Sequence, residues 1–312
     1  MKKRALVLGL ASVLLAVEAS AQIRIGVSMA LFDDVWLTTL RHEIKRAATE
    51  RGALVEIKDA RNQVGLQLNQ VHDFLESGVD AIIVNPVDTD ATVSMSDDAL
   101  ASATPLVYVN RMPINVDMLP DSQAFVASNE EESGTVQTQE VCKLMDGKGR
   151  VVVIMGELSN QAAIQRTRDI HNVLSTAPCR DMEIVDEQTA NWDRDKGRQL
   201  MHNWLAAGTE FDAVISNNDE MAIGAIEALK EHDRSMDDVI VAGIDATSDG
   251  LAAMQAGDLD VTVFQNARGQ AEGAVKLAID LALNQSAPRL LWIPFELVTP
   301  DNLSEFVDEP VQ

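Results

Sequence analysis

The sequence predicts an α/β protein made of two doubly wound domains, each with a parallel sheet. Short apolar runs rich in β-branched residues alternate with helical patterns along the chain, and many of the helical patterns end at a glycine. Gly52 precedes the run Leu54 to Ile57, for example, and Gly78 precedes Ala81 to Val84. Glycine adopts the left-handed conformation that ends a helix, and strands buried on both faces read as continuous apolar runs. Alternating strands and helices imply right-handed crossovers and parallel strands.

Length and composition favour two domains over one. The chain has 312 residues, of which 46% are hydrophobic and 24% are charged, which is a globular composition. About ten strands are too many for one comfortable open sheet of this size. No linker rich in proline, glycine or serine separates two halves, so the pattern of residues alone does not place the boundary.

The chain is strongly acidic. Lys and Arg number 25 and Asp and Glu 49, which gives a formal net charge of −24. A surface with this charge repels nucleic acid and anionic lipid, so we expect neither as a partner.

Residues 1–21 are interpreted as a signal peptide. The basic residues Lys2 to Arg4 precede the apolar run Ala5 to Val17, and Ala19-Ser20-Ala21 forms a cleavage site of small residues. The run is shorter than the roughly 20 residues of a transmembrane helix. We therefore expect cleavage after Ala21 and export, as a protein not embedded in the membrane, to a bacterial periplasm.

Export makes the two cysteines informative, because disulfides persist in oxidising compartments. Cys142 lies late in a helical pattern, and Cys179 lies in the loop after the next helix. Both fall at the same end of neighbouring strand–helix units. A disulfide is favoured over two buried thiols, which remain the alternative.

Polar and aromatic residues follow the strands, where ligands bind in open α/β sheets. Amides and carboxylates exchange hydrogen bonds with hydroxyl groups, arginine offers a planar donor fork, and tryptophan faces cover the apolar side of a ring. Such a set suits a neutral polyhydroxylated ligand. Its members are Phe32, Asp33, Asp34 and Trp36 after the first run, Asn85, Pro86 and Asp88 after the third, Asn110 and Arg111 after the fourth, then Asn191 to Asp193, Asn217 to Asp219, Asp245 and Gln265.

Structural roles alone also explain many of these residues. Asp34, Asp88, Asp193 and Asp219 all precede helical patterns, where an N-cap role is common. Trp204 is interpreted as a packing residue, as is Trp292. Only the convergence of many strand ends favours a binding site.

Patterns typical of catalysis are missing from the sequence. It contains no G-x-S-x-G nucleophile elbow, no Walker loop and no dinucleotide-binding glycine pattern. The five histidines fall in helical patterns, and two distant cysteines lack zinc-ligand spacing. We therefore expect no enzymatic activity, no catalytic residue, no cofactor and no metal.

Several phrases in order resemble the periplasmic sugar-binding proteins of ABC importers, in the ribose-, galactose- and inositol-binding class. The resemblance covers nearly all of the chain after residue 21, and each phrase alone is weak. The phrases are Asn85-Pro86-Val87-Asp88, Asn110-Arg111 after Val107-Tyr108-Val109, Asn218 to Ala225 (NDEMAIGA), Val241 to Ala246 (VAGIDA), and Phe264-Gln265.

The resemblance implies the type I periplasmic binding protein fold, in which two domains joined by three crossovers clamp the ligand between them. It puts the crossovers near Val126, Gln265 and Ile293. The expected domains are 22–126 plus 266–292 and 127–265 plus 293–312. Ligand contacts carried over by position are Asp34, Trp36, Asn110, Arg111, Arg166, Trp192, Asn218, Asp245 and Gln265.

Two departures from the ribose-type pattern bear on the ligand. Asp34 stands where that pattern has Asn, and Asn110 stands where it has Asp, so the carboxylate has moved across the pocket. Leu37 and Ile244 replace aromatic residues, which leaves Trp36 and Trp192 as the stacking surface. These departures argue against ribose and favour a cyclitol such as myo-inositol, with an aldohexopyranose second.

The expected partners are a small sugar or cyclitol, an inner-membrane ABC permease and, as an option that the sequence does not separate from transport, a chemoreceptor. We expect a monomer. The repressors that share this fold are excluded by the signal peptide and the acidic surface. A periplasmic α/β enzyme acting on a sugar is the alternative from another class, and it would need a catalytic pair that the sequence does not offer.

Overall fold

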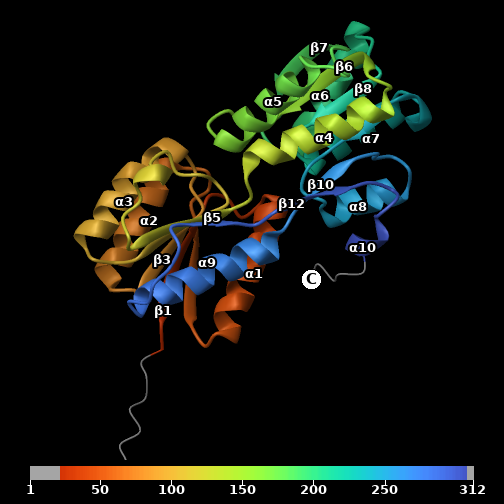
Figure 1. Ribbon diagram of the computed structural model, residues 1–312. Coiled ribbons are helices and arrows are strands. Elements are labelled where there is room, and N and C mark those ends of the chain that lie inside the picture. Colours follow the sequence, from red (N-terminus) through yellow and green to blue (C-terminus); the bar gives the residue numbers. More distant parts are fainter. Residues whose placement is uncertain (1–21, 308–312) are drawn as a thin grey trace, which may run out of the picture.

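The computed structural model describes residues 22–307, and Figure 1 shows two lobes joined by a narrow waist. The expected signal peptide, residues 1–21, lies outside the described residues. Within 22–307 no helix is long and apolar enough to cross a membrane. Each lobe combines a parallel sheet with helices, so the α/β class and the two domains expected from the sequence are confirmed.

The first lobe is a six-stranded parallel sheet with helices on both faces. The strand order is β11-β5-β4-β3-β1-β2. The strands are β1 (Arg24–Met29), β2 (Leu54–Asp59), β3 (Ala81–Val84), β4 (Leu106–Val109), β5 (Gln123–Ala127) and β11 (Leu290–Trp292). The helices are α1 (Val35–Glu50), α2 (Val64–Ser77), α3 (Thr92–Ala101) and α9 (Ala267–Ala282), with short 3-10 turns η1 (Thr89–Ala91) and η2 (Val116–Met118).

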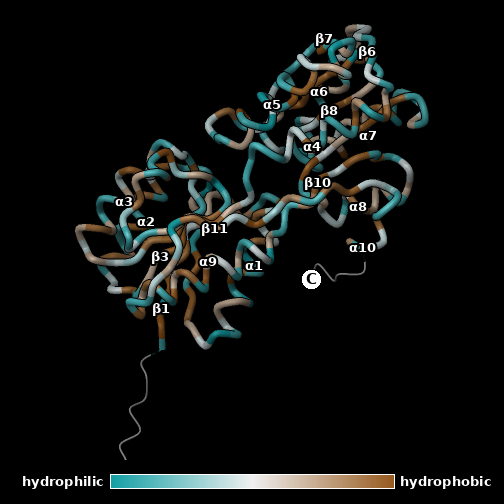
Figure 2. The backbone as a smooth tube through the Cα atoms, in the orientation of Figure 1, coloured by the Kyte–Doolittle hydropathy of each residue, from teal (hydrophilic) through white to brown (hydrophobic). Residues whose placement is uncertain are grey.

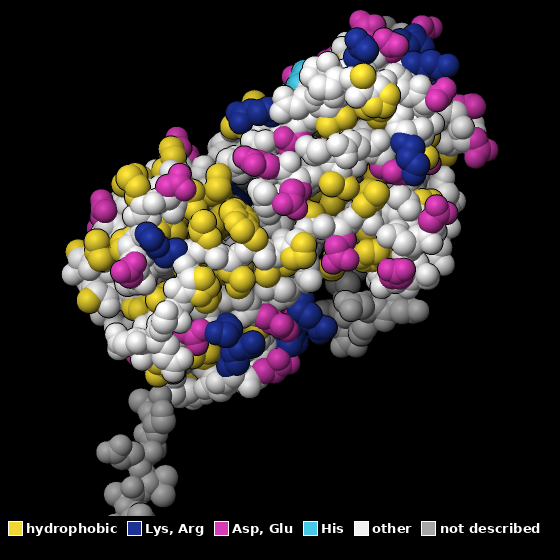
Figure 3. Space-filling view, in the orientation of Figure 1, with side chains coloured by type: hydrophobic (Ala, Val, Ile, Leu, Met, Phe, Trp, Pro, Cys, Tyr) yellow, Lys and Arg dark blue, Asp and Glu magenta, His cyan; other side chains and the backbone are white. Residues whose placement is uncertain are grey.

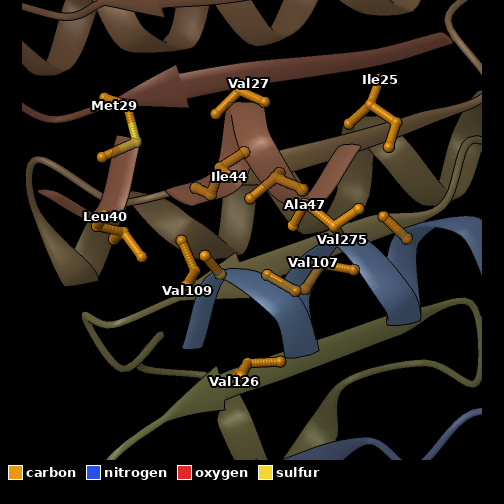
Figure 4. Close-up of a cluster of buried hydrophobic side chains, with 14 of the residues drawn as sticks. Ile25, Val27, Met29, Leu40, Ile44, Ala47, Val107, Val109, Val126 and Val275 are labelled. Carbon is orange, nitrogen blue, oxygen red and sulfur yellow. The ribbon is translucent and has the colours of Figure 1, made fainter. Parts of the chain in front are cut away.

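Helix α1 covers one face of this sheet together with α9, while α2 and α3 cover the other. The apolar stripe of α1, which includes Leu40, Ile44 and Ala47, packs on the strands beside Val275 of α9 (Figure 4). Each such Leu or Ile stabilises the fold by about 1.5–3 kcal/mol when fully buried. Figure 2 shows the hydrophobic colour running along strand segments inside this lobe.

The second lobe has a four-stranded parallel sheet in the order β7-β6-β8-β9 and a separate two-stranded sheet, β10-β12. Helices α4 and α5 pack on one face of the larger sheet and α6 and α7 on the other. The strands are β6 (Lys148–Met155), β7 (Asp181–Thr189), β8 (Ala213–Ser216), β9 (Ile240–Ala242), β10 (Thr262–Gln265) and β12 (Phe295–Val298). The helices are α4 (Glu130–Leu144), α5 (Gln161–Leu174), α6 (Arg194–Ala207), α7 (Asp219–Glu231), α8 (Ser248–Gln255) and α10 (Ser304–Val307), with the 3-10 turn η3 (Met236–Asp238).

The β10–β12 pair departs from the expected parallel arrangement, because it is antiparallel. The physical reason is the path of the chain. β10 leads out of the second lobe toward α9, whereas β12 leads back into it from β11. Two neighbouring segments that cross the waist in opposite directions must pair antiparallel.

The chain passes between the two lobes three times: from β5 to α4, from β10 to α9 and from β11 to β12. These passages lie next to Val126, Gln265 and Ile293, the positions where the resemblance puts the crossovers. The exact boundaries of the two domains stay a prediction.

A disulfide joins Cys142 in α4 to Cys179 in the loop before β7, with 5.7 Å between the Cα atoms. Both residues are buried beside Val141, Ile170 and Met182. The bridge therefore ties the end of α4 to the loop between α5 and β7, within the second lobe.

Candidate functional site

A pocket lies between the two lobes, at the carboxyl ends of strands from both. All nine candidate residues from the sequence line it, together with Leu37, Asn160 and Ala162. Its empty volume is about 370 Å³, including its open mouth. Two tryptophans and several hydrogen-bonding side chains line it, and such a mixture of apolar surfaces with a few polar groups is typical of a site for a small polar ligand. The nine are Asp34, Trp36, Asn110, Arg111, Arg166, Trp192, Asn218, Asp245 and Gln265.

Asp34 has both roles that the sequence left open. Its side chain caps α1 by accepting a hydrogen bond from the backbone N–H of Leu37 at 2.7 Å. It also lines the pocket, where burial raises the pKa of its carboxyl group, while the bond from Leu37 and the charge of Arg111 oppose that rise. A short polar side chain at a helix start can thus cap the helix and line the pocket at the same time.

Trp36 is fixed against the waist of the molecule. It lies in the first turn of α1, and its indole Nε1–H donates to the backbone oxygen of Gln265 at 3.0 Å. Its only donor is thereby used, so its ring can serve a ligand only as an apolar surface.

Asn110 holds a left-handed backbone conformation, with φ of 67°, directly after β4. Asparagine tolerates that conformation better than most residues. Its Oδ1 accepts a hydrogen bond from Asn85 Nδ2 at 3.2 Å. The amide NH₂ group of Asn110 is left to donate to a ligand.

Arg111 is buried, and its Nη1 donates to the backbone oxygens of Pro86 and Val87 at 3.0 and 3.2 Å. Burial lowers the pKa of its guanidinium group, and the charges of Asp34 and Glu157 oppose that change. Nε and Nη2 have no hydrogen-bond acceptor among residues 22–307 in the structure, so these donors are available to a ligand.

Arg166 differs from the expectation of a donor fork open to ligand hydroxyls. Its Nε and Nη2 donate to both oxygens of Glu130 at 2.8 and 2.9 Å, and its Nη1 donates to the backbone oxygen of Asn217 at 2.7 Å. The side chains of Arg166 and Glu130 are only 4% and 7% exposed. A buried guanidinium needs a counter-charge, and the sequence did not identify Glu130, 36 positions away, as that partner.

Asp245 lies beside Arg166 on the same side of the pocket, with Oδ1 3.8 Å from Nη1. Burial holds the pKa of its carboxyl group well above the usual range, although the charge of Arg166 acts in the opposite direction. Gln265 completes this side: its Oε1 lies 3.4 Å from Arg166 Nη2. The Nε2 of Gln265 is a buried donor for which the described part of the chain supplies no acceptor.

Trp192 forms the aromatic surface of the second lobe. Its backbone has a φ of 66°, and its ring lies so close to Gly156 that a Cβ there would sit 2.2 Å from the ring. Glycine at 156 is therefore required by the approach of the indole. The ring centroid lies 5.7 Å from the guanidinium carbon of Arg166.

The interpretation of Asp219 as an N-cap is wrong. The N-cap of α7 is Asn218, whose Oδ1 accepts from the backbone N–H of Met221 at 3.0 Å. Asp219 is the first residue of the helix and is fully buried beneath the pocket. Two polar residues in a row after a strand leave this assignment ambiguous from sequence. By contrast, Asp88 and Asp193 do act as N-caps.

Asn160 and Ala162 also line the pocket but were not among the candidates. Asn160 caps α5, and its Oδ1 accepts from the backbone N–H of Ala162 at 3.1 Å. The available signal was a polar residue just before a helical pattern, five positions beyond the end of β6, the same signal that identified Asp34.

Two buried asparagines support the pocket floor in the same way in both lobes. Asn85 follows β3, and its Oδ1 accepts from the backbone N–H of Ala30 just after β1, at 3.3 Å. Asn217 follows β8, and its Oδ1 accepts from the N–H of Gly156 just after β6, at 3.0 Å. Each asparagine therefore ties together the ends of two neighbouring strands that carry pocket residues.

The lobes also touch at the mouth of the cleft. Asn62, before α2, donates from Nδ2 to the two carboxylate oxygens of Glu157 at 3.2 and 3.3 Å. The mouth is lined by charged residues of both lobes, including Asp33, Arg194 and Lys196. In the space-filling view, Asp and Glu side chains are scattered over both lobes (Figure 3). No group of three potential metal ligands converges among the residues that the structure describes.

Comparisons with known proteins identify relatives of the whole described chain. A model of the periplasmic binding protein domain matches residues 25–286. The chain is 58% identical over 301 residues to a rhizopine-binding protein of Rhizobium meliloti, covering 96% of this chain and 97% of that one.

Solved structures give the same result. An ABC transporter solute-binding protein of Bacillus halodurans with bound myo-inositol matches at a TM-score of 0.87 and 41% identity, over 93% of this chain and 99% of that one. The myo-inositol-binding protein of Caulobacter, also with myo-inositol bound, matches at a TM-score of 0.86 and 27% identity, over 94% and 99%. The family consists of substrate-binding proteins and not of enzymes. The chain belongs to the periplasmic binding protein family.

Proposed function

We propose that this protein is a periplasmic receptor that captures a neutral cyclitol, myo-inositol-like first and an aldohexopyranose second, and delivers it to an inner-membrane ABC permease. The observation that carries the proposal is the convergence of all nine candidate residues on one pocket between the lobes. The myo-inositol bound in two structural relatives supports this ligand class, and the relative in Rhizobium meliloti is described as binding rhizopine.

The chemistry of the pocket fits a ring with hydroxyl groups around its whole rim. Trp36 and Trp192 offer apolar surfaces to the ring faces. Asp34 and Asp245 accept hydrogen bonds from hydroxyl groups, whereas the free donors of Arg111 bind hydroxyl oxygens. Asn110 donates through its NH₂ group because Asn85 already occupies its oxygen.

Closure of the two lobes is the proposed mechanism. One lobe supplies Asp34 and Arg111, and the other supplies Trp192 and Asp245, so neither lobe binds the whole ligand alone. A ligand favours the closed state by the contacts that it makes only there. We propose that the protein acts as a monomer and is exported by its cleaved signal peptide.

Calorimetric titration with myo-inositol, glucose, galactose, ribose and a rhizopine tests the ligand class. We expect the tightest binding to a cyclitol and at least tenfold weaker binding of ribose, which corresponds to about 1.4 kcal/mol. A thermal-shift screen against a wider panel would find a better ligand, since a ligand that binds only the folded state raises the unfolding midpoint. Tightest binding to ribose would contradict the argument from Asp34 and Asn110.

A swap variant sharpens the test. The double substitution Asp34→Asn and Asn110→Asp restores the ribose-type pattern and should narrow the preference for cyclitol over ribose. Asp88→Asn is the matched control, because Asp88 caps η1 through Asp90 N at 2.8 Å and lines neither the pocket nor its mouth. If the control shifts the preference as much as the swap does, the moved carboxylate is not its cause.

A further inference from the structure

We propose that the buried pair Thr262 and Asp219 positions Asp245 for ligand binding, although neither residue touches the ligand pocket. The inference rests on the proposed function in one respect, which is that Asp245 contacts the ligand. It assigns a positioning role to two residues beneath the pocket.

The backbone of Asp245 and Ala246 is strained. Their φ angles are 121° and 51°, in the left-handed region that favours glycine. Each such residue costs on the order of 1–3 kcal/mol and persists only where the surroundings hold it in place. These two backbone angles turn the chain sharply after β9, at the point where Asp245 lines the pocket.

Asp219 holds the far side of this turn. Its Oδ2 accepts from the backbone N–H of Thr247 at 2.8 Å, and its own N–H donates to the backbone oxygen of Ile244 at 2.8 Å. One buried residue thus binds the chain on both sides of the strained Asp245–Ala246 step. Its first-turn position in α7 provides a rigid base for these bonds.

Thr262 links Asp219 to the strained step itself. Its hydroxyl group donates to Asp219 Oδ1 at 2.7 Å and accepts from the backbone N–H of Ala246 at 3.1 Å. Because Asp219 Oδ1 receives the hydroxyl proton, the oxygen lone pairs of Thr262 are free to face Ala246. The carboxylate therefore sets the direction of this hydrogen bond.

Two glycines show that the space is shaped for this carboxylate. A Cβ atom at Gly243 would lie 2.2 Å from Asp219 Oδ1, and one at Gly250 would lie 2.3 Å from Oδ2. Neither glycine has a left-handed φ, so the need for glycine at both positions comes from the close approach of Asp219.

The same strand that carries Thr262 ends at the waist. The N–H of Asp245 donates to the backbone oxygen of Val263 at 2.8 Å, and the N–H of Gln265 donates to the oxygen of Asp245 at 3.2 Å. Disturbing Thr262 should therefore affect Asp245 and Gln265 together, two residues that line the pocket.

The test uses Thr262→Val, which has nearly the same shape but no hydroxyl group, and Thr262→Ser, which keeps the hydroxyl. Thr138→Val is the matched control, because Thr138 is equally buried and its hydroxyl bonds only Gly134 O within α4, at 2.6 Å. The readouts are calorimetric affinity for the tightest ligand of the panel and amide hydrogen exchange of residues 245–247.

We expect Thr262→Val to lower affinity about tenfold and to speed exchange at Ala246 and Thr247. Thr262→Ser should restore both, and Thr138→Val should leave both at wild-type values. Unchanged affinity and exchange in Thr262→Val overturn the proposal, as does equal loss in Thr262→Ser, which would indicate packing rather than hydrogen bonding. If Thr262→Val does not fold, Asp219→Asn takes its place, and unchanged exchange at Thr247 in that variant refutes the role.

The outcome also separates this inference from the proposed function. If no ligand of the panel binds the wild-type protein, the proposed function fails, yet exchange at residues 245–247 still tests the positioning role without any ligand. If ligand binds and Thr262→Val matches wild type in both readouts, only the positioning role fails.

Discussion

The buried ion pair between Arg166 and Glu130 makes two separate effects measurable in one variant. Arg166→Met removes the charge and retains much of the side-chain volume. It leaves Glu130, whose side chain is 7% exposed, without its counter-charge. Breaking a buried pair in this way costs about 3–5 kcal/mol of folding free energy. The variant also removes the positive charge that lies 3.8 Å from Asp245 in the pocket, so we expect weaker ligand binding as a second effect.

A second substitution separates stability from binding. Adding Glu130→Gln to Arg166→Met removes the stranded charge, so we expect the unfolding free energy to recover in large part. Ligand affinity should stay low, because Arg166 is still missing. Urea unfolding measures the first quantity, and calorimetric titration measures the second.

Two results would refute this reasoning. A stability loss below about 1 kcal/mol in the single variant would mean that the pair is solvated rather than buried. Recovery of both stability and affinity in the double variant would mean that Arg166 acts on the ligand only through the fold.

Three further predictions follow from the structure. Burial raises the pKa of Asp219 to about 7 from 3.8, against the hydrogen bond from Thr262. Its contribution to stability is therefore fully present below pH 3.8 and lost as pH rises through 7. Between pH 4 and pH 8 the wild-type protein should lose up to about 4 kcal/mol of unfolding free energy that Asp219→Asn does not lose, as measured by urea unfolding. The same pH dependence of the unfolding free energy in both proteins would contradict this prediction. Small-angle scattering should give a smaller radius of gyration with ligand than without. Asn62→Ala, which breaks the contact with Glu157, should shift the ligand-free protein toward the open state. An unchanged radius of gyration at saturating ligand counts against closure. Thiol titration of denatured, unreduced protein should find no free thiol from Cys142 and Cys179, whereas two free thiols would exclude the bridge.

The location of the pocket was predictable because it depends on local sequence. Each strand is a short apolar run, and a residue just after such a run lies at the carboxyl end of the sheet wherever the strand sits. Asp34, Asn110 and Asp245 could therefore be assigned to the ligand side without knowledge of the packing. The helix N-cap signal helped in the same way, although it could not distinguish Asn218 from Asp219.

The sequence by itself determined the α/β class, the strand ends that carry polar groups and, through the family resemblance, the two-lobed arrangement. Periodicity and strand-end position are local properties, since each is set by residues within a few positions of one another. The tertiary structure alone decided that Arg166 binds Glu130, that Thr262 reaches Asp219, and that β12 returns antiparallel to β10. These contacts join residues 30 to 43 positions apart. Which residues meet over such distances depends on how helices and strands pack. The packing energy is a sum over the whole fold, so no short segment of sequence determines it.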